Sequence, residues 1–166
     1  MKLWNLYKAV RQQQEILGVK GWLQCRFREK EGDEWTTLWT LPKPNKIVFV
    51  GVAQAVKCWG DGATAVFGWG AVGTGTNAPV DGDTALQTEV DRQATAFSQI
   101  TTTITNDTGQ WISTHTAPGG GWDITEYALV NAASAGIIYN RVTFTAIHLD
   151  EGNQLQFTYQ SQLTRI

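Results

Sequence analysis

Residues 124–163 read ITEYALVNAASAGIIYNRVTFTAIHLDEGNQLQFTYQSQL, and this stretch decides the fold. A short apolar strand with a charged break leads into a turn of small residues, and two long strands of alternating polar and apolar residues follow. The stretch holds hardly any side chain suited to catalysis. A segment this regular and this poor in reactive groups favours a protein that holds a shape and presents a surface.

The preceding residues continue the same pattern of strand-like runs and turn signals. From Ala94 to the end of the chain, turns are expected at residues 106–109, 118–121, 131–136 and 150–153. Short strands at such regular spacing are typical of an antiparallel sandwich or barrel. The predicted fold class is therefore all-β, mainly an antiparallel sandwich or barrel, with a short helix and an N-terminal helix or arm.

Three segments have helical patterns. Residues 3–17 carry apolar side chains near one helical face, so a short helix or an arm is expected there. Residues 46–58 combine a strand-like start with a helix-like end, and we place a helix or half-buried segment there. Thr84 and Gln87 match a capping box for a short helix over residues 84–90. The apolar side chains of the first segment are Leu3, Leu6, Tyr7, Val10 and Leu17.

A hairpin is predicted between the N-terminal segment and the main β-body. Residues 20–29 alternate in polarity, and residues 34–41 continue as a second strand. Two prolines end the hairpin because proline cannot donate to a strand ladder. The second of them, Pro44, marks a boundary. Residues 1–44 are expected to form an attachment or interface region, and residues 45–166 are expected to form the sandwich or barrel body.

The composition excludes several functions. The 166 residues carry a formal charge of -2, so the basic surface that nucleic-acid binding needs is missing. The sequence has no apolar run near the roughly 20 residues that span a membrane and no visible signal peptide, so a soluble protein made in the cytosol is expected. Cys25 and Cys58 lie in apolar contexts and are expected to be free thiols.

The sequence predicts no catalytic, cofactor or metal site, and hence no enzyme. The run GWGAVG matches G-x-G-x-x-G, but the residues after it cannot open the helix that a dinucleotide site needs. Asp81, Asp83 and Glu89 lack the spacing of a calcium loop, and a turn and helix capping explain them. His115 and His148 have few further zinc ligands to recruit, and no serine lies in a G-x-S-x-G motif.

The tryptophans are the main candidates for contacts with other molecules, because aromatic anchors dominate protein interfaces. Eight tryptophans in a chain of this length is a high number. Trp111 and Trp122 flank the loop at residues 118–121, where they could stack on a glycan, so a carbohydrate-binding module that contacts the host surface is an alternative. The predicted interface residues are Trp4, Tyr7, Trp22, Trp35 and Trp39.

Two blocks of the chain resemble a pattern found in small structural proteins of tailed bacteriophages. Residues 68–92, GWGAVGTGTNAPVDGDTALQTEVDR, show a strand, a GTGT-type loop, a proline stretch, D-T-A-L-x-x-E and an arginine. Residues 124–144, ITEYALVNAASAGIIYNRVTF, and residues 149–163, LDEGNQLQFTYQSQL, are similar to the closing hairpins of the same family. The match covers roughly residues 64–163, and residues 1–44 carry no motif of this family.

This resemblance implies a virion structural protein. Proteins of this kind look like capsid decoration (cement) proteins, or like tail and fibre components. We expect a protein that binds the outside of the phage head and clamps neighbouring subunits of the major capsid protein, as a homotrimer at a local three-fold axis. A tail, baseplate or fibre-attachment protein is the alternative within the same class.

The motif blocks also predict two ion pairs. Glu89 and Arg92 lie three residues apart and are expected to pair on the short helix. Glu126 and Arg141 are expected to pair across two strands. Both pairs suggest that the motif residues support the shape of the protein.

Overall fold

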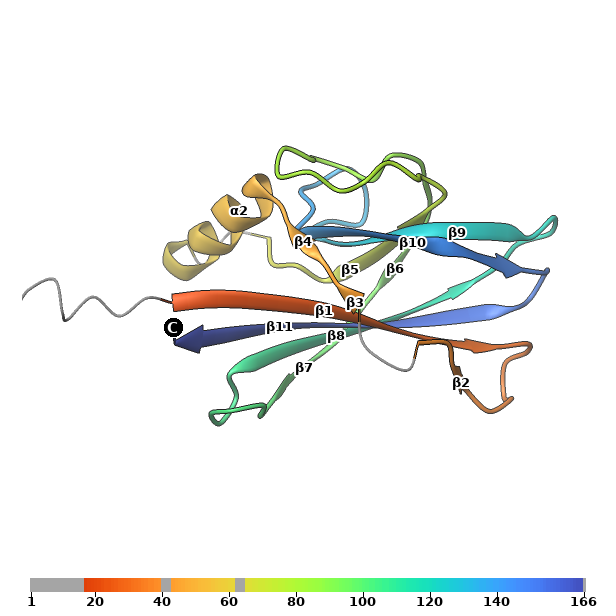
Figure 1. Ribbon diagram of the computed structural model, residues 1–166, viewed down its shortest axis with the longest axis horizontal. Helices are drawn as coiled ribbons and strands as arrows, with labels where there is room; N and C mark the ends of the chain where they lie inside the picture. The colour runs from red at the N-terminus through yellow and green to blue at the C-terminus, as the bar shows by residue number, and fades with distance from the viewer. Residues whose placement is uncertain (1–16, 40–42, 62–64, 166) are drawn as a thin grey trace, which may run out of the picture.

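The computed structural model describes residues 17–39, 43–61 and 65–165, which form two facing antiparallel sheets (Figure 1). This confirms the predicted all-β fold. The first sheet consists of β1 (Leu17–Arg28), β2 (Thr36–Thr37), β3 (Lys43–Pro44), β7 (Ala96–Ile100), β8 (Thr108–Thr116) and β11 (Gln154–Arg165). The second sheet consists of β4 (Lys46–Ile47), β5 (Trp69–Gly73), β6 (Glu89–Ala94), β9 (Trp122–Val130) and β10 (Asn140–Leu149).

β1 and β11 form the longest ladder of the first sheet and pair along their whole length. The predicted alternation of residues 20–29 is confirmed, because Leu23 and Cys25 are buried and Trp22 lies half-buried on the other face. β1 belongs to the predicted N-terminal region 1–44. Its ladder with β11 nevertheless places it in the same sheet as three strands of the body.

Both edges of the sandwich are joined by chain that passes from one sheet to the other. At one edge, β3 pairs with β1 and β4 pairs with β10, with only Asn45 between them. At the other edge, β6 pairs with β5 and β7 pairs with β8, with only Thr95 between them. Asn45 Nδ2 donates to Tyr159 Oη at 3.0 Å, and Thr95 N donates to Gly68 O at 2.9 Å. These corners give the sandwich a barrel-like closure.

Aromatic side chains fill the space between the sheets. Phe157 is fully buried, with ring centroids 4.9 Å from Tyr127, 5.8 Å from Phe144 and 6.3 Å from Trp39. Tilted and edge-on ring pairs at these separations are favourable, and each large ring removes much apolar area from water. Phe157 therefore lies at the centre of the core that holds the two sheets together.

The helix α2 (Phe49–Gly60) follows β4 and lies against one end of the sandwich (Figure 1). The prediction for residues 46–58 is therefore confirmed in part, since a two-residue strand precedes the helix. The two buried residues of α2, Gly51 and Gln54, are small or polar, and Val50 packs beside them against the core. Gln54 Nε2 donates to Ala65 O at 2.8 Å, and a Cβ atom on Gly51 would lie 2.3 Å from Tyr139 O. The helix can approach the sheet this closely because residue 51 is glycine.

Gly51→Ala should lower the free energy of unfolding by about 1–3 kcal/mol, the usual cost of forcing extra atoms into a packed site. The added methyl group would meet the backbone of Tyr139, which cannot move without disturbing its strand neighbours. Gly60→Ala is the matched control, because a Cβ there meets no atom within 4 Å. Urea unfolding of both variants tests this, and equal stabilities would contradict it.

The predicted helix over residues 84–90 is wrong. This part of the chain forms a loop that leads directly into β6. The backbone N–H groups of Gln87 and Thr88 donate to the carboxylate of Glu126, at 3.1 and 2.9 Å, and not to carbonyls within a helix. The side chain of Gln87 accepts hydrogen bonds from a neighbouring loop and completes no capping box with Thr84. Tertiary hydrogen bonds therefore override a local helix signal.

Three further predictions for the N-terminal region need correction or lie outside the described residues. Within residues 34–39, the described part of the predicted strand over residues 34–41, only β2 is a strand, and it pairs with β1 through two residues. Pro44 does not stand outside the sheet, because β3 pairs with β1 opposite Trp22. The predicted helix over residues 3–17 falls outside the described residues except for Leu17, which begins β1.

Candidate functional site

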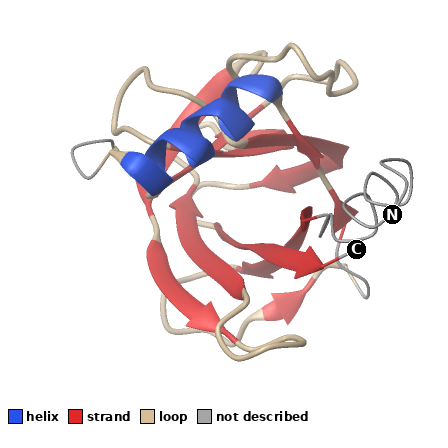
Figure 2. Ribbon diagram, turned by 90° about the vertical axis from the view of Figure 1, so that its left-hand side faces the viewer, coloured by secondary structure: helices blue, strands red, loops and turns tan. Residues whose placement is uncertain are grey.

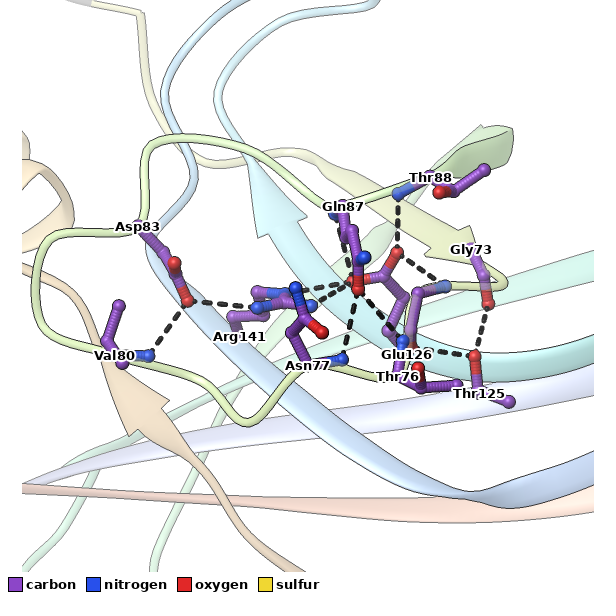
Figure 3. Close-up of polar contacts among 11 residues, drawn as sticks. Gly73, Thr76, Asn77, Val80, Asp83, Gln87, Thr88, Thr125, Glu126 and Arg141 are labelled. Carbon is purple, nitrogen blue, oxygen red and sulfur yellow. Dashed lines mark hydrogen bonds and ion pairs between the residues drawn. The ribbon is translucent and has the colours of Figure 1, made fainter.

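Glu126 lies in β9, fully buried, at the point where the motif blocks meet (Figure 3). Its Oε1 accepts hydrogen bonds from Gly75 N at 3.0 Å and Thr88 N at 2.9 Å. Its Oε2 accepts from Gln87 N at 3.1 Å and from Arg141 Nε at 2.9 Å, and Arg141 Nη2 lies 2.8 Å from the same oxygen. A carboxylate offers about four lone-pair sites, so Glu126 has no acceptor left for a substrate proton.

Arg141 connects this carboxylate to a second one. It lies in β10 and is buried, which confirms the predicted ion pair with Glu126 across two strands. Arg141 Nη1 donates to Asp83 Oδ2 at 3.1 Å, and the same oxygen accepts from Val80 N at 2.9 Å. Asp83 was predicted to cap a helix, and it binds a buried guanidinium and closes a turn.

Two glycines of the GTGT-type loop are required by the position of Glu126. A Cβ atom would lie 2.6 Å from Glu126 Oε1 if placed on Gly73, and 2.4 Å from it if placed on Gly75. The hydroxyl of Thr125 donates to Gly75 O at 2.8 Å and holds the loop from the other side. Glycine is needed here because the backbone approaches a carboxylate too closely for any side chain.

Arg92 holds the turn of small residues at 131–136 through hydrogen bonds to its backbone carbonyls. Its Nη2 lies 2.7 Å from Glu89 Oε2, so the second predicted ion pair is confirmed, although on β6 and not on a helix. Its Nη1 donates to Ala132 O at 2.7 Å and to Ala135 O at 2.6 Å. Ala135 has a φ of 51°, a left-handed conformation that is strained for a residue with a side chain. The guanidinium therefore stabilises a strained turn.

A second buried polar chain connects the two sheets. His115 Nδ1 lies 2.7 Å from Asp91 Oδ2, and His115 Nε2 lies 3.0 Å from Ser113 Oγ. The order of atoms is that of a Ser-His-Asp triad, which sequence reasoning missed because none of the three residues lies in a catalytic motif. Ser113 is only 1% exposed and His115 is fully buried, so a substrate carbonyl has no path to the serine oxygen. The chain connects β6 to β8.

Asp91 should make the stability depend on pH. Burial raises its pKa, but the hydrogen bond and charge of His115 outweigh burial and hold the pKa below its usual value. Stability from a lowered carboxyl pKa is present above the unfolded value, about 3.9, and is lost as pH falls through the folded pKa. Below about pH 4, the wild type should therefore lose stability more steeply than Asp91→Asn. Denaturant unfolding over that range measures both slopes, and equal slopes would contradict the assignment.

An apolar pocket of about 490 Å³ lies between α2 and the strands at one end of the sandwich. Figure 2 looks onto this end, with α2 lying across one side of it. Trp111 forms part of its wall, with its Nε1 donating to Phe67 O at 2.9 Å and its ring 5.1 Å from that of Phe97. Further lining residues are Val19, Cys58, Trp59, Tyr139 and Leu163.

The predicted interface tryptophans occupy different environments. Trp22 is half-buried, and its indole N–H donates to a glutamine of β11. Trp35 lies under the guanidinium of Arg28, at 4.4 Å from the ring centroid. Trp39 is half-buried and packs against the core, edge-on to Phe144 at 5.1 Å. The other two predicted residues, Trp4 and Tyr7, lie outside the described part of the chain, and an interface role for all five stays a prediction.

Sequence reasoning missed the outward face of α2. Phe49, Val52, Val56 and Trp59 are between 49% and 69% exposed, although all four are apolar. Their spacing of three, four and three residues is that of one helical face, and this spacing was visible in the sequence. A helix that turns four large apolar residues outward presents a surface suited to contact with another protein segment.

Within residues 17–39, 43–61 and 65–165, no group of three or more His, Cys, Asp or Glu side chains could hold a metal ion. The same residues include no helix that is both long and apolar enough to cross a membrane. Comparisons of the chain with family models, with curated proteins and with solved structures give no match.

Proposed function

We propose that this protein is a structural subunit of a phage particle that binds the outside of the head and clamps neighbouring major capsid subunits. The observation that carries the proposal is the cluster around Glu126. The residues that resemble the phage structural family meet there, and they use their polar groups to close loops onto one another. A motif with this role preserves a shape, as expected of a protein whose function is to fit a lattice.

Two properties support binding over catalysis. The carboxylate of Glu126 and the hydroxyl of Ser113 are both buried, and their hydrogen bonds are made within the protein. The exposed apolar face of α2 offers the kind of surface that packs against another protein. The glycan alternative receives no such support, because Trp111 and Trp122 are half-buried and not exposed platforms.

The mechanism would be stabilisation by mass action. A ligand that binds only the expanded, assembled lattice lowers the free energy of that state and leaves the dissociated subunits unaffected. A homotrimer at a local three-fold axis would contact three neighbouring capsid subunits at once. We assign the contacts to the tryptophan-rich N-terminal region and to the outward face of α2, and the location to the virion surface.

Co-sedimentation with expanded, tail-less capsids that lack the protein tests this proposal. We expect saturable binding at a fixed ratio to the major capsid protein, and little binding to unexpanded heads. Val56→Lys on α2 should weaken the binding by about tenfold or more, as for substitution of an interface anchor. Val80→Lys is the matched control, because Val80 is equally exposed at 56%, against 55% for Val56, and lies elsewhere.

The absence of binding to expanded heads would contradict the proposed decoration role. Recovery of the protein with purified tails or baseplates would then favour the alternative, a tail or fibre-attachment protein. Equal loss of binding in the two lysine variants would show that α2 is not the contact surface and would leave the N-terminal region as the site of attachment.

A further inference from the structure

The pocket beside α2 is open to solvent and has an apolar rim. Phe97 is 58% exposed, Trp59 is 69% exposed, and Val19 and Leu163 are each 45% exposed. Large apolar side chains gathered around an apolar cavity are costly to leave in water, because each square ångström of buried apolar surface contributes about 25 cal/mol. The rim therefore favours a covering segment with an apolar face of its own.

One such segment joins the described chain at this rim. β1 begins at Leu17, only two residues before Val19. Val19 and its ladder partner Leu163 on the neighbouring strand both line the pocket. The described fold therefore begins beside the opening. Sixteen residues would extend about 24 Å as a helix, which is more than the roughly 18 Å of the twelve-residue α2. The segment is long enough to cover the pocket without help from another chain.

The sequence of residues 1–16 matches the surface that it would cover. At helical spacing, Leu3, Leu6 and Val10 fall on one face. Lys8 and Gln12 fall on the opposite face. A helix here would turn these three apolar side chains toward the pocket and turn Lys8 and Gln12 toward solvent.

We propose that residues 1–16 dock into the pocket of their own chain, with the apolar face of the segment against Phe97, Trp59 and Leu163. The docked segment covers the open end of the sandwich and completes its core. The occupant is this part of the chain itself, so the inference does not depend on the particle to which the protein belongs.

Disulfide trapping on the full-length protein tests the docking directly. Cys58 lines the pocket and offers a thiol there. Cys25 is fully buried, and burial raises the pKa of its thiol, so it does not compete. Leu6→Cys and Val10→Cys place a partner on the apolar face, and Gln12→Cys, only two residues from Val10, places one on the polar face. A disulfide needs Cα atoms within about 7 Å, so only a docked segment can form it readily.

With oxidised glutathione as the oxidant, we expect Leu6→Cys or Val10→Cys to form an intramolecular bond with Cys58 on the order of tenfold faster than Gln12→Cys, because docking raises the effective thiol concentration. Adding Phe97→Lys at the rim should remove this preference, whereas adding Val80→Lys, away from the pocket, should leave it unchanged. Circular dichroism confirms that each variant is folded. The monomeric cross-linked form is identified on a non-reducing gel.

Equal rates for the three cysteine variants would overturn the docking. A preference of the same kind that appears only as disulfide-linked dimers would overturn docking within one chain and show exchange of the segment between two copies. Docking would cover Trp59 but leave Phe49, Val52 and Val56, which do not line the pocket, for contact with the capsid. Failure of the co-sedimentation experiment would leave the trapping result intact. The two proposals therefore fail separately.

Discussion

Arg141→Met should lower the free energy of unfolding by about 3–5 kcal/mol, because it leaves a buried carboxylate without its counter-charge. Arg141 is 3% exposed and Glu126 is fully buried, so water cannot replace the lost guanidinium. Methionine has a similar length and keeps most of the packing of the arginine stem. Denaturant unfolding at neutral pH measures the loss, and the loops at residues 73–76 and 83–88 should exchange their amide protons faster.

Two controls separate burial from charge in this result. Lys46→Met removes an exposed ion pair with Asp81, whose side chain is 50% exposed, and should cost at most about 1 kcal/mol. Adding Glu126→Gln to Arg141→Met removes the unpaired charge and should recover part of the stability. The recovery should be incomplete because three backbone N–H groups still need an acceptor. A loss below about 1 kcal/mol for Arg141→Met would contradict the central role of the cluster.

Phe157→Ala should cost about 3–5 kcal/mol, the usual range for removing a buried aromatic ring. Phe157 is fully buried, and its ring packs against Tyr127 from the opposite sheet. The vacated space cannot easily collapse, because β11 is held by ladders to β1 and β8 on both sides. Thermal and urea unfolding of the variant should show the same loss if the protein unfolds in one cooperative step.

Phe49→Ala is the matched control for this cavity. It deletes the same atoms from α2, where the ring is 68% exposed and lies outside the pocket lining, and should cost much less than Phe157→Ala. Similar losses for the two variants would contradict Phe157 as the centre of the core.

The strand pattern and the Glu126–Arg141 ion pair were predictable from the sequence because both depend on simple periodicity. Alternating residues place Leu23 and Cys25 inward, and long alternating runs identify β10 and β11 without any knowledge of their partners. The two charged residues each interrupt an apolar strand pattern, and a buried charge requires a partner of opposite sign.

The loop at residues 84–88 shows where local reasoning was insufficient. Its capping-box letters favour a helix, and the hydrogen bonds that prevent it come from Glu126, which is 38 and 39 residues away in the chain. The Ser113–His115–Asp91 chain likewise joins strands from two sheets, so its geometry exists only after the sheets pack. A local motif contains no information about such distant partners.

The sequence by itself determined the all-β class, the facing of β1 and the charged pairs that the motif blocks require. Tertiary structure alone decided that the chain changes sheets at Asn45 and Thr95, and that α2 turns its large apolar residues outward. The physical reason is the range of the interactions. Periodicity acts between neighbouring residues, whereas corners, buried networks and open pockets depend on which distant surfaces compete for the same space.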